Sequence, residues 1–330
     1  MSINILDRPT DLAGPLPLPF CGFPRAKDVA YHGLQLLPET LPLVDFELAR
    51  PHRSNRYTPT PAAQLSPPQQ LEMARIIARS FAKRDALTRH LQPPKNPPAA
   101  LLEQTHTDPY GCEPFGEWTQ ENITYWSIRL FELTDPDSPR NAIQLNMKVL
   151  EPSMALINEA GDVLGGVLNE PYPSITEPFS FRRDDPFIDA VLSFVKPIFD
   201  FLDAQGAEAL PALCNKYPAF EDAYAQGKVG RPFMAARDDA ISSKEAFEQM
   251  AATAERYQQL GYEYQLIEAT HQWPASAWET LGAVRVHFAP FRTIQRVPIH
   301  AVPHEDGVSS PDGYIADRDT GSMFYVLRLK

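Results

Sequence analysis

The sequence predicts an α/β protein with a mixed, mainly antiparallel sheet flanked by helices, and three patterns support this fold class. Residues 153–172 place short apolar runs on either side of a Gly-Asp turn, which is typical of an antiparallel hairpin. Residues 184–228 are apolar at helical spacing, and from residue 231 onward strand-like and helix-like periods alternate. The chain has 330 residues, of which 43% are apolar, so it is long enough and apolar enough to bury a large core.

The first part of the chain, residues 1–65, is predicted to be a proline-rich arm. The chain has 34 prolines, and many of them fall within its first hundred residues. Because proline fixes φ and removes a hydrogen-bond donor, loops are favoured over continuous sheet, although residues 42–51 could form one strand. We expect the arm to pack on the domain surface. Covering a cleft and strapping two copies into a homodimer are the alternatives.

The remaining residues, 66–330, are predicted to form the α/β domain. Pro67 and Pro68 suit the first turn of a helix that follows Ser66 and ends before Pro93. The apolar residues of this segment recur at helical spacing, so one face of the helix should pack against the core.

A second helix is predicted over residues 119–133. Thr119 is its expected N-cap, because a threonine hydroxyl can accept from the unpaired N–H groups of the first turn. Trp126 and Phe131 should lie in the core, and Glu132 should be exposed.

The apolar segment at about 184–228 is predicted to be a helical insertion, kinked at Pro197. After it the two periods alternate: a strand, a helix that Gly261 terminates, a strand, a short helix and two further strands. The segments are, in order, 231–238, 242–261, 262–270, 275–282, 284–297 and 324–329.

Charge and cysteine content exclude several classes of protein. A formal net charge of −12 opposes sequence-independent binding to nucleic acid or to an anionic membrane surface. The 3 cysteines lie far apart, and no apolar run reaches the length of a membrane span, so a cytoplasmic protein is expected. His300 and His304 are flanked by prolines that oppose a helix, so no metal site is predicted.

Residues 150–286 resemble, in the order and spacing of their elements, the core of the GNAT superfamily of acyl-CoA-dependent N-acyltransferases. The matching elements are the hairpin, the strand before residue 242, the helix that stops at Gly261, the strand that ends in EAT and the helix that ends in LGA. The resemblance implies a GNAT-type sheet with a helical insertion. It also implies an acyl-CoA donor, such as acetyl-CoA, and a small-molecule amine acceptor of unknown identity.

In that family, a turn of the form Gln/Arg-x-x-Gly-x-Gly/Ala leads into the central helix and holds the diphosphate of CoA with backbone N–H groups. The turn aligns with residues 241–246, where Lys244 replaces the expected glycine. The alternative interpretation is that Ser243 is the N-cap of an ordinary helix with Glu245 in its first turn. The resemblance places the phosphate contacts at Ser242, Ser243, Lys244 and Ala246.

The resemblance also assigns the pantetheine arm and the catalytic base. Glu268 and His271 lie where the acceptor would meet the thioester, so either could take the amine proton. The backbone contacts to pantetheine are assigned to Ala235, Ala236 and Arg237.

One departure from the family pattern affects catalysis. Where many members have a tyrosine that protonates the leaving thiolate, this chain has Trp278, and an indole N–H does not titrate usefully near neutral pH. Together with the lost glycine, this keeps a second hypothesis open: a GNAT-fold protein without catalysis that acts as a binding or assembly module.

Overall fold

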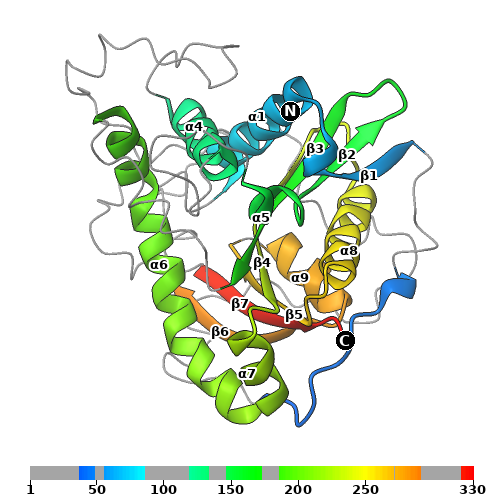
Figure 1. Cartoon of the computed structure of the whole chain (residues 1–330), viewed down its shortest axis with the longest axis vertical. Coiled ribbons are helices and arrows are strands. Elements are labelled where there is room, and N and C mark those ends of the chain that lie inside the picture. Colours follow the sequence, from blue (N-terminus) through cyan, green and yellow to red (C-terminus); the bar gives the residue numbers. More distant parts are fainter. Residues whose placement is uncertain are drawn as a thin grey trace, which may run out of the picture.

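The computed structural model describes residues 37–48, 56–85, 119–133, 146–172, 186–270, 272–290 and 321–330 (Figure 1). Within these residues a 7-stranded sheet has the order β1-β2-β3-β4-β5-β7-β6. The described pairings are antiparallel except the one between β4 and β5, which is parallel. The strands are β1 Tyr57–Pro61, β2 Met154–Asn158, β3 Val163–Tyr172, β4 Val229–Arg237, β5 Tyr264–Ala269, β6 Val284–Pro290 and β7 Gly321–Arg328.

Helices cover both faces of the sheet, with α6 along one side of the molecule in Figure 1. Alternate residues of β5 identify the faces: Leu266 packs with α6 and α7, and Ile267 packs with α8 and α9. Helix α1 packs over β3 and β4, and α4 packs on α1 and contacts α6, so both helices share the face of α6. The helices are α1 Pro67–Arg84, α4 Gln120–Leu133, α5 Met147–Leu150, α6 Pro186–Lys216, α7 Pro218–Ala225, α8 Ser243–Gln259 and α9 Gln272–Thr280.

The predicted fold class is confirmed, and the local signals explain where several elements begin and end. The hairpin forms as β2 and β3, with Gly161 in its turn at φ 90°. Helix α1 starts after Ser66, which forms a capping box with Gln69. Helix α8 is followed by Gly261 at φ 90°, a conformation that glycine adopts without steric cost.

The predicted helical insertion corresponds to α6 and α7. Helix α6 continues through Pro197 and packs against β6 and β7. At this contact Gln205 Nε2 donates a hydrogen bond to the backbone oxygen of Ser322, at 2.8 Å. The insertion therefore covers one face of the C-terminal half of the sheet.

Two expectations about the arm and α4 were wrong. Residues 42–48 do not form a strand: Phe46–Leu48 is a short 3-10 helix, and Leu43 makes only an isolated bridge to Arg328; residues 49–51 lie outside the described residues. The predicted exposed residue Glu132 is fully buried, because it pairs with the buried guanidinium of Arg129 one turn earlier.

The arm also contributes to the sheet itself. Strand β1, from residues 57–61, pairs antiparallel with β2 at the sheet edge. Pro59 and Pro61 are tolerated there because an edge strand leaves alternate N–H positions unpaired. The other parts of the arm, together with His300 and His304, lie mostly outside the described residues.

Candidate functional site

The site begins where the parallel strands β4 and β5 separate. Their pairing consists of Val229 with Tyr264 and Gly230 with Gln265. Beyond this point β4 runs on to Arg237 and β5 to Ala269 without mutual pairing. We call this separation the fork.

A cavity of about 170 Å³ occupies the fork. Its walls include β4 from residue 232 to 237, the end of β5 from residue 267 to 270, and side chains from α1, α4, α6, α8 and α9. On β4, Leu168 of β3 pairs with Met234 and Asn169 pairs with Pro232, so Phe233 is an extra residue, a β-bulge. Bulges bend a strand away from its neighbour and are frequent beside functional sites.

Tyr257 of α8 fixes the closed end of the fork. Its ring packs so closely on β4 that a Cβ atom at Gly230 would lie 2.1 Å from Tyr257 Cε1. The Tyr257 hydroxyl donates to the backbone oxygen of Glu170 at 2.8 Å and accepts from the N–H of Arg231 at 3.1 Å. A tyrosine from the covering helix thus joins β3 to β4 at the point where the fork starts.

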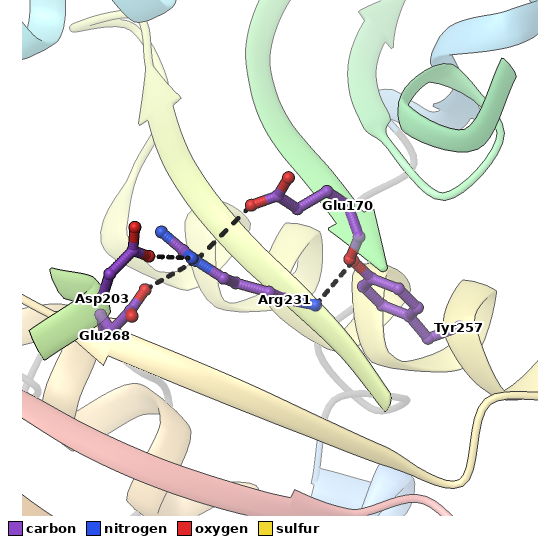
Figure 2. A network of polar contacts seen from close by, with 5 residues as sticks. All are labelled: Glu170, Asp203, Arg231, Tyr257 and Glu268. Carbon is purple, nitrogen blue, oxygen red and sulfur yellow. Dashed lines mark hydrogen bonds and ion pairs between the residues drawn. The ribbon is translucent and has the colours of Figure 1, made fainter. Parts of the chain in front are cut away.

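Arg231, on β4 just beyond this point, is buried and is the centre of an ionic network (Figure 2). Its Nε lies 2.9 Å from Glu268 Oε2 and 3.6 Å from Glu170 Oε1. Its Nη1 lies 3.6 Å from Oδ1 of Asp203, a residue of α6 whose side chain is 64% exposed. Figure 2 shows the guanidinium between Glu170 on one side and Asp203 with Glu268 on the other.

This network shifts the ionisation of its members. Burial raises the pKa of Glu268 to about 7; Arg231 partly opposes the shift, and the charges of Glu170 and Asp203 add to it. For Arg231, burial lowers the pKa, but the surrounding carboxylates outweigh burial and leave it raised, so the guanidinium stays charged. Glu268 is therefore able to accept or release a proton near neutral pH, as a general base requires.

The start of α8 has a different character. Ser242, and not Ser243, is the N-cap: its hydroxyl accepts from the N–H of Glu245 at 3.3 Å. In return the Glu245 carboxylate accepts from the Ser242 N–H at 2.9 Å, which completes a capping box. Ser243 is buried, and its hydroxyl accepts from Arg237 Nη2 at 3.4 Å. A carboxylate of the chain itself thus takes a donor that a phosphate would use.

The predicted site residues fall into two groups. One group lines the cavity: Ala235, Ala236, Arg237, Ala246 and Glu268. The other group, Ser242, Ser243 and Lys244, lies at the start of α8 and does not line the cavity. His271 lies outside the described residues.

Trp278 is buried at 3% exposure in the core under α8 and α9, and its ring also forms part of the cavity wall. Asp85, directly after α1, brings a further carboxylate to this wall, where its Oδ1 accepts from Thr270 Oγ1 at 2.7 Å. Among the described residues no group of three or more His, Cys, Asp or Glu side chains could hold a metal ion. In the same part of the chain, no helix is long and apolar enough to cross a membrane.

Sequence reasoning missed Arg231, Glu170 and Asp203. A usable signal existed for Arg231, because an arginine stands near the start of an otherwise apolar strand, and a buried arginine requires carboxylate partners. The identity of these partners depends on the pairing of distant strands, and the local sequence does not encode it.

Comparisons with known proteins found similar solved structures. The C-terminal condensation domain of Ebony, solved in complex with beta-alanyl-dopamine, is similar with a TM-score of 0.50 and 12% identity, over 83% of this chain and 99% of that one. Arylalkylamine N-acetyltransferase 2 from Aedes aegypti (TM-score 0.44, 14% identity, 84% and 100% coverage) is a more distant likeness. So is a GCN5-related N-acetyltransferase from Kribbella flavida (TM-score 0.38, 10% identity, 83% and 98% coverage). No family model matches the sequence, and no curated protein does.

The strand order, the parallel β4–β5 pair and the fork beside it are those of the predicted GNAT-type sheet. The chain therefore has a GNAT-type fold.

Proposed function

We propose that this protein is an N-acyltransferase that moves an acyl group from an acyl-CoA, such as acetyl-CoA, to an amine. The observation that carries the proposal is the fork: a central strand leaves its parallel neighbour, and the cavity between them contains a carboxyl group with a pKa of about 7. Backbone groups of Ala235, Ala236 and Arg237 would pair with the pantetheine arm, which is a flexible chain of amides.

In the proposed reaction Glu268 takes a proton from the amine nitrogen as the nitrogen attacks the thioester carbonyl carbon. A C–N bond forms, the C–S bond breaks, and the departing thiolate receives the proton, so the products are an amide and free CoA thiol. His271 remains a second candidate for the base. Most of the rate enhancement would come from holding the two reactants in one geometry.

Two residues favour the second hypothesis, a GNAT-fold binding or assembly module without catalysis. Glu245 occupies the start of α8 with negative charge, which opposes a diphosphate there. Trp278 stands where many GNAT enzymes have a tyrosine and cannot act as the proton donor.

Calorimetric titration with acetyl-CoA and longer acyl-CoAs separates the two hypotheses. The enzyme hypothesis expects binding with a Kd of about micromolar order, followed by thiol release when an amine is added. Absence of binding across the acyl series would leave the module. Glu268→Gln tests the base, because it should stop thiol release while acyl-CoA still binds.

A further inference from the structure

The cavity extends through the fork from one face of the sheet to the other. Trp273, Trp278 and Met250 line it from α9 and α8 on one face. Phe131 and Phe199 line it from α4 and α6 on the opposite face. A donor and an acceptor could therefore approach each other from opposite faces and meet between β4 and β5.

The compartment on the α4 and α6 face is aromatic. The ring centroids of Phe131 and Phe199 lie 5.4 Å apart, and those of Phe131 and Phe233 lie 5.2 Å apart. Val195 and Leu202 of α6 add aliphatic wall. Burying an apolar ligand body against such a surface stabilises binding, whereas a strongly hydrated group would lose its water there without gaining a polar contact.

Glu268 forms the polar end of this compartment. Its side chain is 2% exposed and lies on the α6 face, since it shares the Arg231 network with Asp203. Neither carboxylate oxygen of Glu268 has a hydrogen-bond partner among the described residues, although Oε2 forms the ion pair with Arg231, and Glu268 belongs to the cavity wall. When Glu268 is ionised, Arg231 brings one positive charge against the carboxylates of Glu170, Asp203 and Glu268, so the network then carries excess negative charge. A buried carboxylate in this position is stabilised by a cation.

We propose that this compartment binds the acceptor, and that the acceptor is an apolar monoamine. Its ammonium group would contact Glu268, and its aromatic or aliphatic body would pack on Phe131, Phe199 and Phe233. For acyl transfer the ammonium first releases one proton to solvent, which leaves the neutral amine that attacks the thioester. The assignment of this amine as acceptor rests on the proposed function, but its binding does not. A diamine is the competing occupant, because Asp85 offers a second carboxylate on the cavity wall.

The test is calorimetric binding to the full chain without any acyl donor. The probes are 2-phenylethylamine, the uncharged 2-phenylethanol and the diamine putrescine. We expect 2-phenylethylamine to bind at least about tenfold more tightly than either of the others. The alcohol lacks the charge-assisted hydrogen bond to the carboxylate, and putrescine lacks the apolar contact with the aromatic rings.

Matched variants assign the two contacts. Glu268→Gln should reduce affinity for 2-phenylethylamine by about tenfold or more and leave the affinity for 2-phenylethanol unchanged. Glu263→Gln, which removes a carboxylate paired with Lys228 on the surface, should change neither. Phe199→Leu should weaken the binding of both aromatic probes by a few-fold. Phe201→Leu, on the same helix but outside the cavity, should not.

Equal binding of the amine and the alcohol, or preference for putrescine, would overturn the inference. Loss of binding in Glu263→Gln or Phe201→Leu to the same degree as in the cavity variants would also overturn it. Binding of 2-phenylethylamine without acyl transfer supports the amine site and counts against the proposed function. Acyl transfer to putrescine without any binding of 2-phenylethylamine does the reverse.

Discussion

The fork and the start of α8 are the two places where an acyl-CoA was expected to touch this chain, and they differ in what builds them. The fork is made by backbone: two strands separate, and a bulge at Phe233 bends one of them. The start of α8 depends on particular side chains, and here Glu245 and Ser242 satisfy each other. A cavity made by strand geometry tolerates changes of side chain, whereas a phosphate cradle depends on a glycine at the position of Lys244 and on backbone N–H groups that no carboxylate of the chain occupies.

The largest expected effect is at the fork. Glu268→Gln should lower the rate of acyl transfer by about 10²–10⁴-fold, the usual contribution of a general base. The affinity for acyl-CoA should stay the same, because the backbone that binds pantetheine is unaltered. Steady-state thiol release and calorimetry measure the two quantities, with Glu263→Gln as the control. Full activity in Glu268→Gln would assign the base elsewhere, with His271 the remaining candidate.

The raised pKa of Glu268 also makes stability depend on pH. Its pKa is about 7 in the folded chain, against 4.5 for an ordinary glutamate, so the folded state holds this proton more tightly. The protonated carboxyl group therefore adds about 3 kcal/mol to the free energy of unfolding. This contribution is fully present below pH 4.5 and is lost as the pH rises through 7.

Urea unfolding at pH 5 and pH 8 measures this contribution. The free energy of unfolding of the wild type should fall relative to that of Glu268→Gln between the two values, since glutamine does not titrate. A constant difference between the two proteins would show that Glu268 is ionised in an ordinary way.

A smaller effect is expected at the closed end of the fork. Gly230→Ala places a methyl group against the Tyr257 ring, at a distance of 2.1 Å in the present geometry. Moving the ring should destabilise the fold by about 2 kcal/mol and disturb the hydroxyl that joins β3 to β4. Thermal unfolding measures the change. Unchanged stability would mean that α8 shifts freely, and that Tyr257 does not fix the fork.

The smallest effect is expected at the start of α8. Lys244→Glu should weaken acyl-CoA binding by about fivefold or more, since it changes the local charge by two units and each unit near a helix N-terminus contributes up to about 1 kcal/mol. Lys228→Glu, at a distant surface pair, is the control. If Lys244→Glu leaves the affinity unaltered, the phosphates lie elsewhere, and the start of α8 has only a structural role.

Much of the fold could be predicted from the sequence because its signals are local. Ser66 with two prolines, the Gly-Asp turn of the hairpin, and Gly261 each mark a boundary through the conformation of a few residues. Strand β4, which forms one side of the fork, could also be predicted, since its pattern and the resemblance both placed a strand at residues 231–238.

The features that were missed depend on contacts between distant segments. The helical pattern predicts that Glu132 is exposed, and only the buried ion pair with Arg129 explains why it is not. Arg231 obtains its partners from β3, α6 and β5, which no local pattern brings together. The N-cap was misplaced by one residue for a different reason: Ser242 and Ser243 are chemically equivalent, and only the reciprocal bond with Glu245 decides between them.

The fork has one consequence for the backbone amides of β4. In an antiparallel pair, alternate N–H groups of a strand point toward its partner, so those of β4 that point away from β3 face the cavity instead of a neighbouring strand. Isotope exchange with solvent should therefore be slow and fast at alternate positions between Pro232 and Arg237, apart from the interruption at Phe233. A pantetheine chain that lies along β4 would slow the fast set selectively, which makes this single strand an internal reporter of occupancy.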